Sequence, residues 1–154
     1  MALITVPIIV GIGLAMGWVS NSGYGNPWFV ALTKPAAMPP GWVFGAAWST
    51  LYMMLGIALA LVLGANEAPG RRSAFILFVG QLALNYSWSP LFFRLHAIEA
   101  AFAVIIVMFG LSYAAALMFG RISRAAGLLM LPYLAWLCFA AYLNFEIIRL
   151  NPAA

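Results

Sequence analysis

Apolar residues fill five long stretches of this chain, and short polar or proline-rich segments separate them. The stretches cover residues 4–20, 41–63, 73–93, 97–119 and 125–149. Their lengths match the roughly 17–25 residues that a helix needs to cross a hydrocarbon core about 30 Å thick. Barrel strands are about half as long and alternate in polarity. The pattern predicts an all-α integral membrane protein, a five-transmembrane-helix bundle forming one domain over residues 1–154.

Composition and charge agree with this class. Hydrophobic residues make up 66% of the chain and charged residues 6%, which excludes a soluble domain. The basic residues flank the stretches, with Arg71, Arg72, Arg121 and Arg124 on one side and Lys34, Arg94 and Arg149 on the other. The positive-inside rule then favours, by four to three, a cytoplasmic N-terminal side. The net charge of +4 does not indicate a nucleic-acid partner. Helical spans favour a bacterial inner membrane or an organellar membrane over a bacterial outer membrane.

The connection over residues 22–40 is the only one long enough to carry structure of its own, so we expect it to form a lid. Within it, residues 26–32 resemble a short helical turn, with Asn26 as the N-cap and Pro27 at the first helical position. The other connections are expected at 64–72, 94–96 and 120–124. A proline- and tryptophan-rich segment, residues 34–48, leads from the lid into the second stretch.

Polar and aromatic residues follow one face of the third stretch. Gln81, Asn85, Trp88 and Phe92 are spaced four, three and four residues apart, which places them on one side of a helix. Polar side chains are costly in lipid, so this face should be turned inward. The two amides are interpreted either as hydrogen-bond links between helices or as ligand contacts, and the sequence leaves both open.

Two other stretches carry matching faces. These faces are Gly45, Trp48 and Tyr52 in the second stretch and Trp136, Ala140, Leu143 and Asn144 in the fifth. Inward aromatic rings beside small residues and amides predict a pocket for a planar apolar ligand. Trp18 and Trp42 are better explained by the aromatic belt at the membrane surface.

Few residues offer reactive chemistry. The single cysteine, Cys138, is expected as a small core residue, and His96 as a residue at the headgroups rather than a haem ligand. Glu146 and Arg149 are spaced for an ion pair. The sequence shows no metal-ligand cluster, triad or phosphate loop, so neither a metal site nor hydrolase chemistry is predicted.

Several motifs together resemble the TspO/MBR family, which includes translocator proteins, also called peripheral-type benzodiazepine receptors, and bacterial tryptophan-rich sensory proteins. The motifs are Trp28, LTKP at 32–35, PPGWVF at 39–44, WSTLY at 48–52, QLALN at 81–85 through Trp88 to PLFF at 90–93, and PYLAW at 132–136 through Ala140 to LN at 143–144 and RLN at 149–151. They follow the family's order and spacing over nearly the whole chain.

The resemblance implies a five-helix bundle, commonly a homodimer, with a pocket beneath the first loop. Such pockets accept porphyrins, isoquinoline or benzodiazepine ligands and, in some members, sterols; no cofactor is obligatory. Carried over by position, the ligand-binding residues are Trp42, Gly45, Trp48, Asn85, Trp88, Trp136, Ala140 and Leu143. The sterol motif is imperfect here, because Phe145 takes the tyrosine position and Tyr142 stands six residues before Arg149.

The resemblance favours a membrane receptor, sensor or translocator that binds a porphyrin. An enzymatic alternative is light-dependent porphyrin degradation, with Trp48 and Trp136 as the candidate catalytic residues. A second alternative is a membrane scaffold whose small-residue seams, at Gly13 to Gly17 and at Gly56, Ala60 and Gly64, pack helices or form a dimer.

Overall fold

The computed structural model of the chain describes residues 1–66 and 68–152; Glu67, Ala153 and Ala154 lie outside the described residues. The regular elements are α1 (Ala2–Val19), α2 (Pro27–Ala31), α3 (Gly41–Gly64), α4 (Arg71–Ser89), the π-helical turn η1 (Pro90–Arg94), α5 (Ile98–Ile122) and α6 (Arg124–Leu150). The described residues contain no strand. The predicted all-α fold is confirmed.

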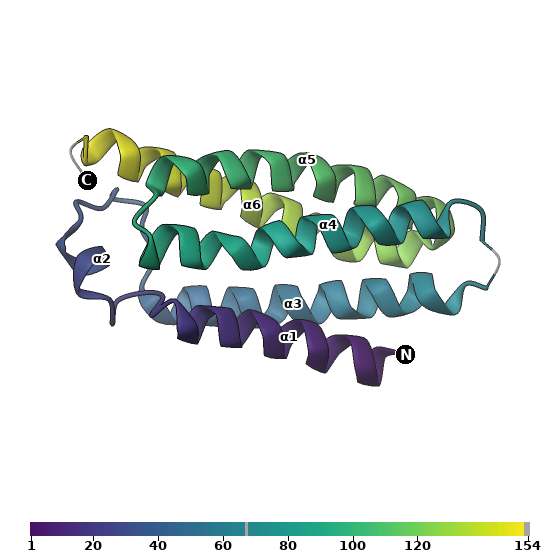
Figure 1. Cartoon of the computed structure of the whole chain (residues 1–154). Helices are drawn as coiled ribbons and strands as arrows, with labels where there is room; N and C mark the ends of the chain where they lie inside the picture. Colours follow the sequence, from purple (N-terminus) through teal and green to yellow (C-terminus); the bar gives the residue numbers. More distant parts are fainter. Residues whose placement is uncertain (67, 153–154) are drawn as a thin grey trace.

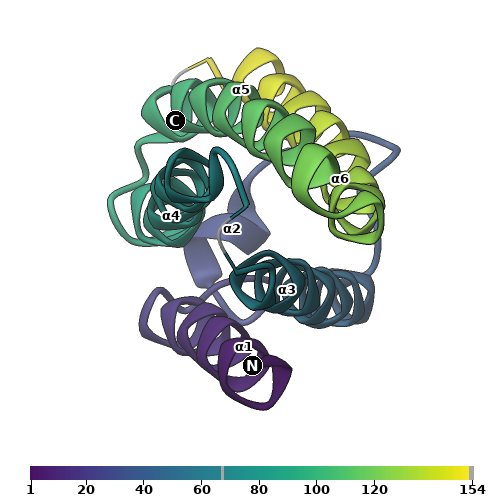
Figure 2. The same ribbon diagram turned by 90° about the vertical axis from the view of Figure 1, so that its right-hand side faces the viewer.

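The five long helices lie side by side along one axis (Figure 1). Seen along that axis, α1 lies beside α3, and the other neighbours follow in the order α6, α5 and α4 (Figure 2). The short helix α2 lies at the end of the bundle that also holds the C-terminus. The N-terminus and the α3–α4 connection lie at the opposite end, as five antiparallel helices require.

Among the described residues, four helices are long and apolar enough to cross a membrane, namely α1, α3, α5 and α6. α4 has a suitable length, 19 residues, but two arginines begin it and Gln81 and Asn85 lie within it. Those two amides are buried inside the bundle, so they lower the apolar character of α4 without facing lipid. That α4 is a fifth membrane span therefore stays a prediction.

Two predicted connections differ from the structure. The third stretch ends in a π-helical turn that includes Arg94, so the connection expected at 94–96 lies at residues 95–97; in this turn the Leu95 amide donates to the Pro90 carbonyl at 3.0 Å. The expected connection at 120–124 shrinks to Ser123, because its extended backbone ends α5 and its hydroxyl caps α6 by accepting from the Ala126 amide. The shortest connection is thus at Ser123 and not beside His96.

Small residues bring α1 and α3 into close contact. A Cβ added to Gly56 would lie 2.7 Å from the Cα of Val6, and one added to Gly13 would overlap the ring of Tyr52. Across the same seam, the Thr5 hydroxyl donates to the Gly56 carbonyl at 2.7 Å. Gly13 and Gly56 therefore serve packing within the chain, whereas the rest of the predicted small-residue seams is not tested by these contacts.

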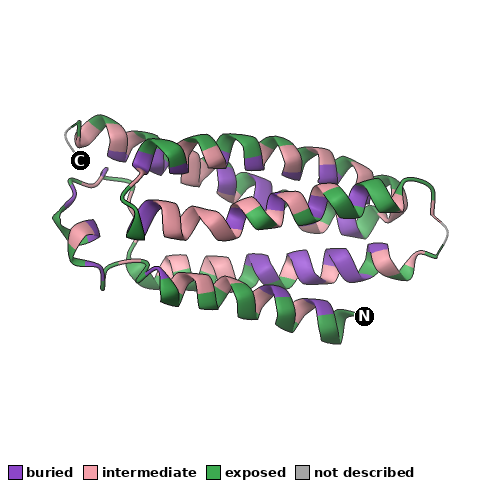
Figure 3. Ribbon diagram, viewed as in Figure 1, coloured by how far each residue is buried: buried purple, intermediate pink, exposed green. Residues whose placement is uncertain are grey.

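Buried residues line the inward faces of the helices, and apolar side chains also cover the outside (Figure 3). Leu117, Leu128 and Leu131 are each about half exposed, which suits a surface in contact with lipid. The expectation for Cys138 was wrong: its side chain is exposed, because it follows buried Leu137 on α6 and the helix turns it outward.

We predict that Gly56→Ala destabilises the fold. Its methyl group cannot be accommodated 2.7 Å from the Val6 backbone unless α1 shifts, and such overpacking costs about 1–3 kcal/mol of unfolding free energy. Thermal unfolding of the purified protein in one detergent, followed by circular dichroism, measures the loss. The matched control is Gly64→Ala in the same helix, where the added Cβ meets nothing within 4 Å. Equal melting temperatures for both variants would contradict the close α1–α3 seam.

Candidate ligand cavity

A cavity of about 470 Å³ lies inside the bundle at the end nearest α2. That volume is within the range of roughly 300–1,000 Å³ found for small-molecule sites. Its lining comes from all five long helices, η1 and the lid. The lining residues are Gly13, Leu14, Gly17, Ser22, Gly23, Tyr24, Phe29, Met38, Gly41, Phe44, Gly45, Trp48, Tyr52, Asn85, Trp88, Ser89, Phe92, Phe93, Ile105, Met108, Trp136, Leu137, Ala140, Leu143, Asn144 and Ile147.

Aromatic rings form much of the cavity wall. Trp48 of α3 meets Trp136 of α6 edge to face, with ring centroids 6.3 Å apart. Phe44 also meets the ring of Trp136, at 6.0 Å. On the α4 side, Trp88 stacks on Phe92 with centroids 5.0 Å apart. Rings that contact one another hold their positions, so they present preformed flat surfaces to a ligand.

Asn85 lines the cavity and links three helices. Its Oδ1 accepts from the Tyr52 hydroxyl at 2.6 Å, and its Nδ2 donates to the Tyr133 hydroxyl at 3.0 Å. These bonds join α4 to α3 and α6. Because both ends of the amide are bonded, Asn85 contributes to the cavity wall while it ties helices together.

Gln81 extends the same network away from the cavity. Its Oε1 accepts from the Tyr133 hydroxyl at 2.8 Å and lies 3.2 Å from the Ser112 hydroxyl of α5. Gln81 and Ser112 are fully buried and do not line the cavity. The question that the sequence left open is therefore answered for Gln81, which links helices, while Asn85 both links helices and lines the cavity.

A second amide fixes the tryptophan of α4. The Trp88 indole N–H donates to Oδ1 of Asn144 at 3.3 Å, and Nδ2 of Asn144 donates to the Ile98 carbonyl at 3.0 Å. Asn144 is only 1% exposed. These two bonds orient the Trp88 ring in the cavity wall and join α4, α6 and the start of α5.

The lid closes the cavity through α2. As predicted, Asn26 caps this helix: its Oδ1 accepts from the amides of Trp28 and Phe29 at 3.0 and 3.3 Å. Its Nδ2 donates to the Phe93 carbonyl of η1 at 3.0 Å, so the cap also fastens the lid to the bundle. The Trp28 ring stacks on His96, with centroids 4.0 Å apart.

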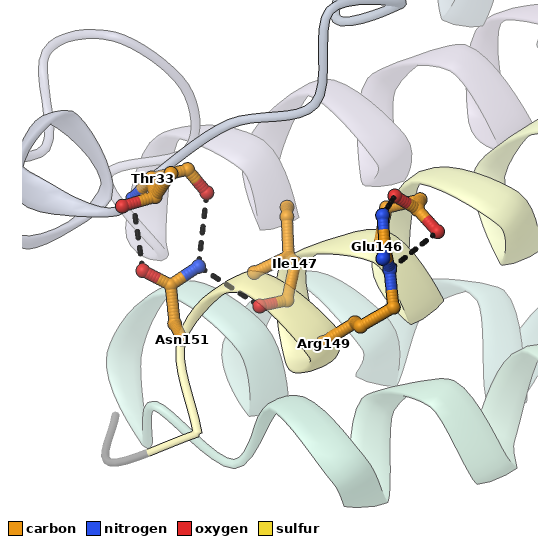
Figure 4. A network of polar contacts seen from close by, with 5 residues as sticks. All are labelled: Thr33, Glu146, Ile147, Arg149 and Asn151. Carbon is orange, nitrogen blue, oxygen red and sulfur yellow. Dashed lines mark hydrogen bonds and ion pairs between the residues drawn. The ribbon is translucent and has the colours of Figure 1, made fainter.

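The far side of the lid is clamped to the end of α6 (Figure 4). Asn151 Oδ1 accepts from the Thr33 amide at 2.8 Å, and its Nδ2 donates to the Thr33 carbonyl at 2.9 Å and to the Ile147 carbonyl at 2.8 Å. The expected ion pair between Glu146 and Arg149 forms nearby, at 2.7 Å, without contacting the lid. One side chain thus holds both backbone groups of Thr33.

The cavity presents no charged side chain among its described lining residues. Lys34 is a basic residue of the lid, but it does not line the cavity. Its Nζ donates to the Val30 and Leu32 carbonyls at 3.0 Å each. It also lies 4.8 Å from the centroid of the Phe29 ring. Partial burial lowers the pKa of Lys34. Lys34 therefore stabilises the C-terminal end of α2.

The structure gathers seven of the eight predicted ligand-binding residues around this cavity: Gly45, Trp48, Asn85, Trp88, Trp136, Ala140 and Leu143. The placement of Trp42 in the pocket was wrong, since its side chain is 74% exposed and does not line the cavity. Trp42 begins α3 one turn before Gly45 and points to the outside. Like Trp18, which is 85% exposed at the same end, it suits the membrane surface.

Some residues of the site escaped the sequence analysis. Tyr133 stands three residues before Trp136, but its spacing alone did not reveal that its hydroxyl lies between the two amides. Ser112 is a serine in an apolar stretch, and a hydroxyl in that position indicates a hydrogen-bond partner inside the bundle. The clamp at Asn151 joins residues 118 positions apart, and the sequence carries no local signal for it.

The fold and this site define a multi-pass helical membrane protein with an apolar, aromatic-walled cavity under a lid. The TspO/MBR family model matches residues 3–150. The tryptophan-rich protein TspO of Chlorobaculum tepidum is 36% identical over 97% of this chain and 98% of its own length. The tryptophan-rich sensory protein of Cereibacter sphaeroides is 40% identical, over 82% and 78%. The translocator protein of Ovis aries is 38% identical, over 81% and 75%.

This chain therefore belongs to the TspO/MBR family, and the resemblance seen in its motifs is confirmed. The family also fixes its location as an integral, multi-pass membrane protein, in agreement with its four membrane-length helices. Membership supports a role as a membrane receptor or sensor.

We predict that Asn151→Ala loosens the lid. The variant loses two hydrogen bonds to Thr33, each worth about 0.5–1.5 kcal/mol net, so the Thr33 amide should exchange about tenfold faster with deuterium. Hydrogen–deuterium exchange with mass spectrometry on residues 27–38 measures the change. Asn66→Ala, at the opposite end of the bundle, is the control. Unchanged exchange in Asn151→Ala would show that the aromatic contacts of α2 hold the lid without the clamp.

Proposed function

We propose that this protein is a membrane receptor or sensor that binds a porphyrin, or another planar apolar ligand, in the cavity beneath the lid. The observation that carries the proposal is the pairing of Trp48 and Trp136 in the cavity wall, 6.3 Å apart and held by Phe44 and Tyr52. A macrocycle offers a large flat face to such indoles. The lining of small residues, including Gly45 and Ala140, leaves room for that face.

The charge of the lining limits how a porphyrin would be oriented. A buried carboxylate without a cationic partner is costly, and the described lining residues offer no such partner. The carboxylates of protoporphyrin IX would therefore lie at the lid, near Ser22 and Tyr24, with the ring inside. The same reasoning favours uncharged aromatic ligands, so the benzodiazepine and isoquinoline classes belong to this proposal.

Other parts of the proposal follow from the family alone. A homodimer is proposed as the assembly, and translocation of the ligand as an extension of binding. Sterol binding is the weakest of these proposals, because the C-terminal motif lacks its tyrosine: Phe145, half exposed on α6, provides a ring without a hydroxyl. No cofactor is part of the proposed receptor function.

We predict that Ala140→Phe weakens porphyrin binding by about tenfold or more. Ala140 lies in the cavity wall, and an added ring would occupy the space that the macrocycle needs. Protoporphyrin IX is titrated in the dark into the protein in nanodiscs, and quenching of tryptophan fluorescence gives the dissociation constant. Tenfold corresponds to about 1.4 kcal/mol.

The matched control is Ala135→Phe, a substitution on the exposed face of the same helix, which should bind like the wild type. The dimethyl ester of protoporphyrin IX is the second ligand, and it should bind at least as tightly as the diacid. Unsaturable quenching that is equal in all variants would overturn the cavity proposal and leave a membrane scaffold. Much tighter binding of the diacid would contradict the orientation of the carboxylates.

A second candidate function is light-dependent degradation of the bound porphyrin. The same two indoles favour it, because both line the cavity and lie in contact. An indole beside a photoexcited macrocycle can donate one electron to it, which leaves an indole radical cation and a porphyrin radical anion. Trp48 and Trp136 would then be the candidate catalytic residues.

We predict that the double variant Trp48→Phe/Trp136→Phe slows the loss of porphyrin absorbance under light, measured against equal amounts of bound porphyrin. The control is Trp42→Phe, which removes an indole that is 74% exposed and outside the cavity. An equal rate in the double variant and the wild type would remove this candidate function without affecting the receptor proposal.

A further inference from the structure

A separate groove lies on the outside of the bundle where α5 and α6 meet, beside the turn at Ser123. Its volume is about 240 Å³, and it shares no lining residue with the central cavity. The residues that matter for its shape and charge are Tyr113, Leu117, Gly120, Arg124, Leu128 and Leu131. We call it the α5–α6 groove.

Two glycines make the floor of the groove. A Cβ added to Gly127 would lie 2.7 Å from the Cα of Gly120, so the two backbones approach closely here. The side chains of Leu117, Leu128 and Leu131 form the walls of the groove and are 51–55% exposed. The floor is low and its walls are aliphatic, a shape that accepts a narrow hydrocarbon chain.

The length of the groove matches one leaflet. On α6 its lining extends from Arg124 to Leu134, about 15 Å at 1.5 Å per residue. The hydrocarbon core is about 30 Å thick, so a groove of this length that starts at the membrane surface would reach about the middle of the bilayer. This is the depth reached by one acyl chain.

A cation marks the end of the groove where a headgroup would lie. Arg124 is an exposed lining residue, and Arg121 lies within one turn of the end of α5. Within residues 1–66 and 68–152, the ion pair found is Glu146 with Arg149, near the other end of α6. A guanidinium binds phosphate oxygens through two parallel N–H groups.

We propose that the α5–α6 groove binds one anionic phospholipid. Its phosphate contacts the Arg124 guanidinium, and one acyl chain lies over Gly120 between Leu117 and Leu128. An anionic headgroup there would neutralise the guanidinium of Arg124, which takes no part in the ion pair found among the described residues. The end of the bundle that holds Arg124 also carries Arg71 and Arg72 and is the side expected to face the cytoplasm, where leaflets are rich in anionic lipid.

The test uses native mass spectrometry of the purified full-length chain in detergent. Phosphatidylglycerol and phosphatidylcholine with the same two oleoyl chains are added in turn. The wild type should retain one phosphatidylglycerol in preference to phosphatidylcholine. Arg124→Gln should reduce that preference about fivefold, the change expected for one contact between an arginine and an anionic headgroup. Its control is Arg72→Gln, an exposed arginine outside the groove at the same end.

A second variant tests the apolar part of the groove. Gly120→Leu should abolish retention of both lipids, because its side chain fills the floor while its Cβ makes an ordinary 3.8 Å contact with Gly127. Gly110→Leu is the control, since Gly110 is exposed on α5 outside the groove and its Cβ meets nothing within 4 Å. Equal lipid retention by the wild type, Arg124→Gln and Gly120→Leu would overturn the proposal. A change of the groove variants from dimer to monomer, with lipid retention unchanged, would assign the groove to self-association instead.

Discussion

The buried hydrogen bonds that centre on Asn85 and Tyr133 are the constraint on which this structure depends. In a membrane no water enters the bilayer core to satisfy a buried amide, so a buried polar group needs a partner within the protein; among the described residues of this network, Nε2 of Gln81 alone lacks one. Asn85 bonds Tyr52 and Tyr133, and Tyr133 bonds Gln81. These side chains come from α3, α4 and α6. Lipid provides little hydrophobic drive to assemble helices, so directional bonds of this kind select one arrangement.

The central cavity follows from that arrangement. The network holds α3, α4 and α6 together at the cavity wall. Asn144 positions Trp88 in the same wall, and the lid lies over the end of the cavity. The hydrogen bonds of Asn85, Tyr133 and Asn144 join different helices, and they hold Tyr52 and Trp88 in the cavity wall. The lid is held by hydrogen bonds of Asn26 and Asn151 and by the packing of Phe29 on Phe92 and Phe93.

Much of the fold and site was predictable because both depend on periodicity. Apolar length located the helices within a few residues, and spacings of three and four placed Gln81, Asn85 and Trp88 on one inward face. Two placements failed: Cys138 as a core residue, and Trp42 as a pocket residue, which came from the family resemblance, whereas the aromatic-belt interpretation of Trp42 agrees with the structure. Both side chains are exposed, because one turn or one residue along a helix decides which way a side chain points. A motif gives the position of a residue in the chain but not the direction in which its side chain points around the helix.

The sequence by itself determined the class of protein, its helical elements, its family and the inward faces that carry aromatic rings and amides. These properties depend on composition and on local helical geometry, which residues close together in the sequence determine. Tertiary structure alone decided which polar groups meet, how Asn151 reaches Thr33, and where a groove opens between α5 and α6. Those features depend on how whole helices rotate and approach one another, and that is set by packing summed over the bundle.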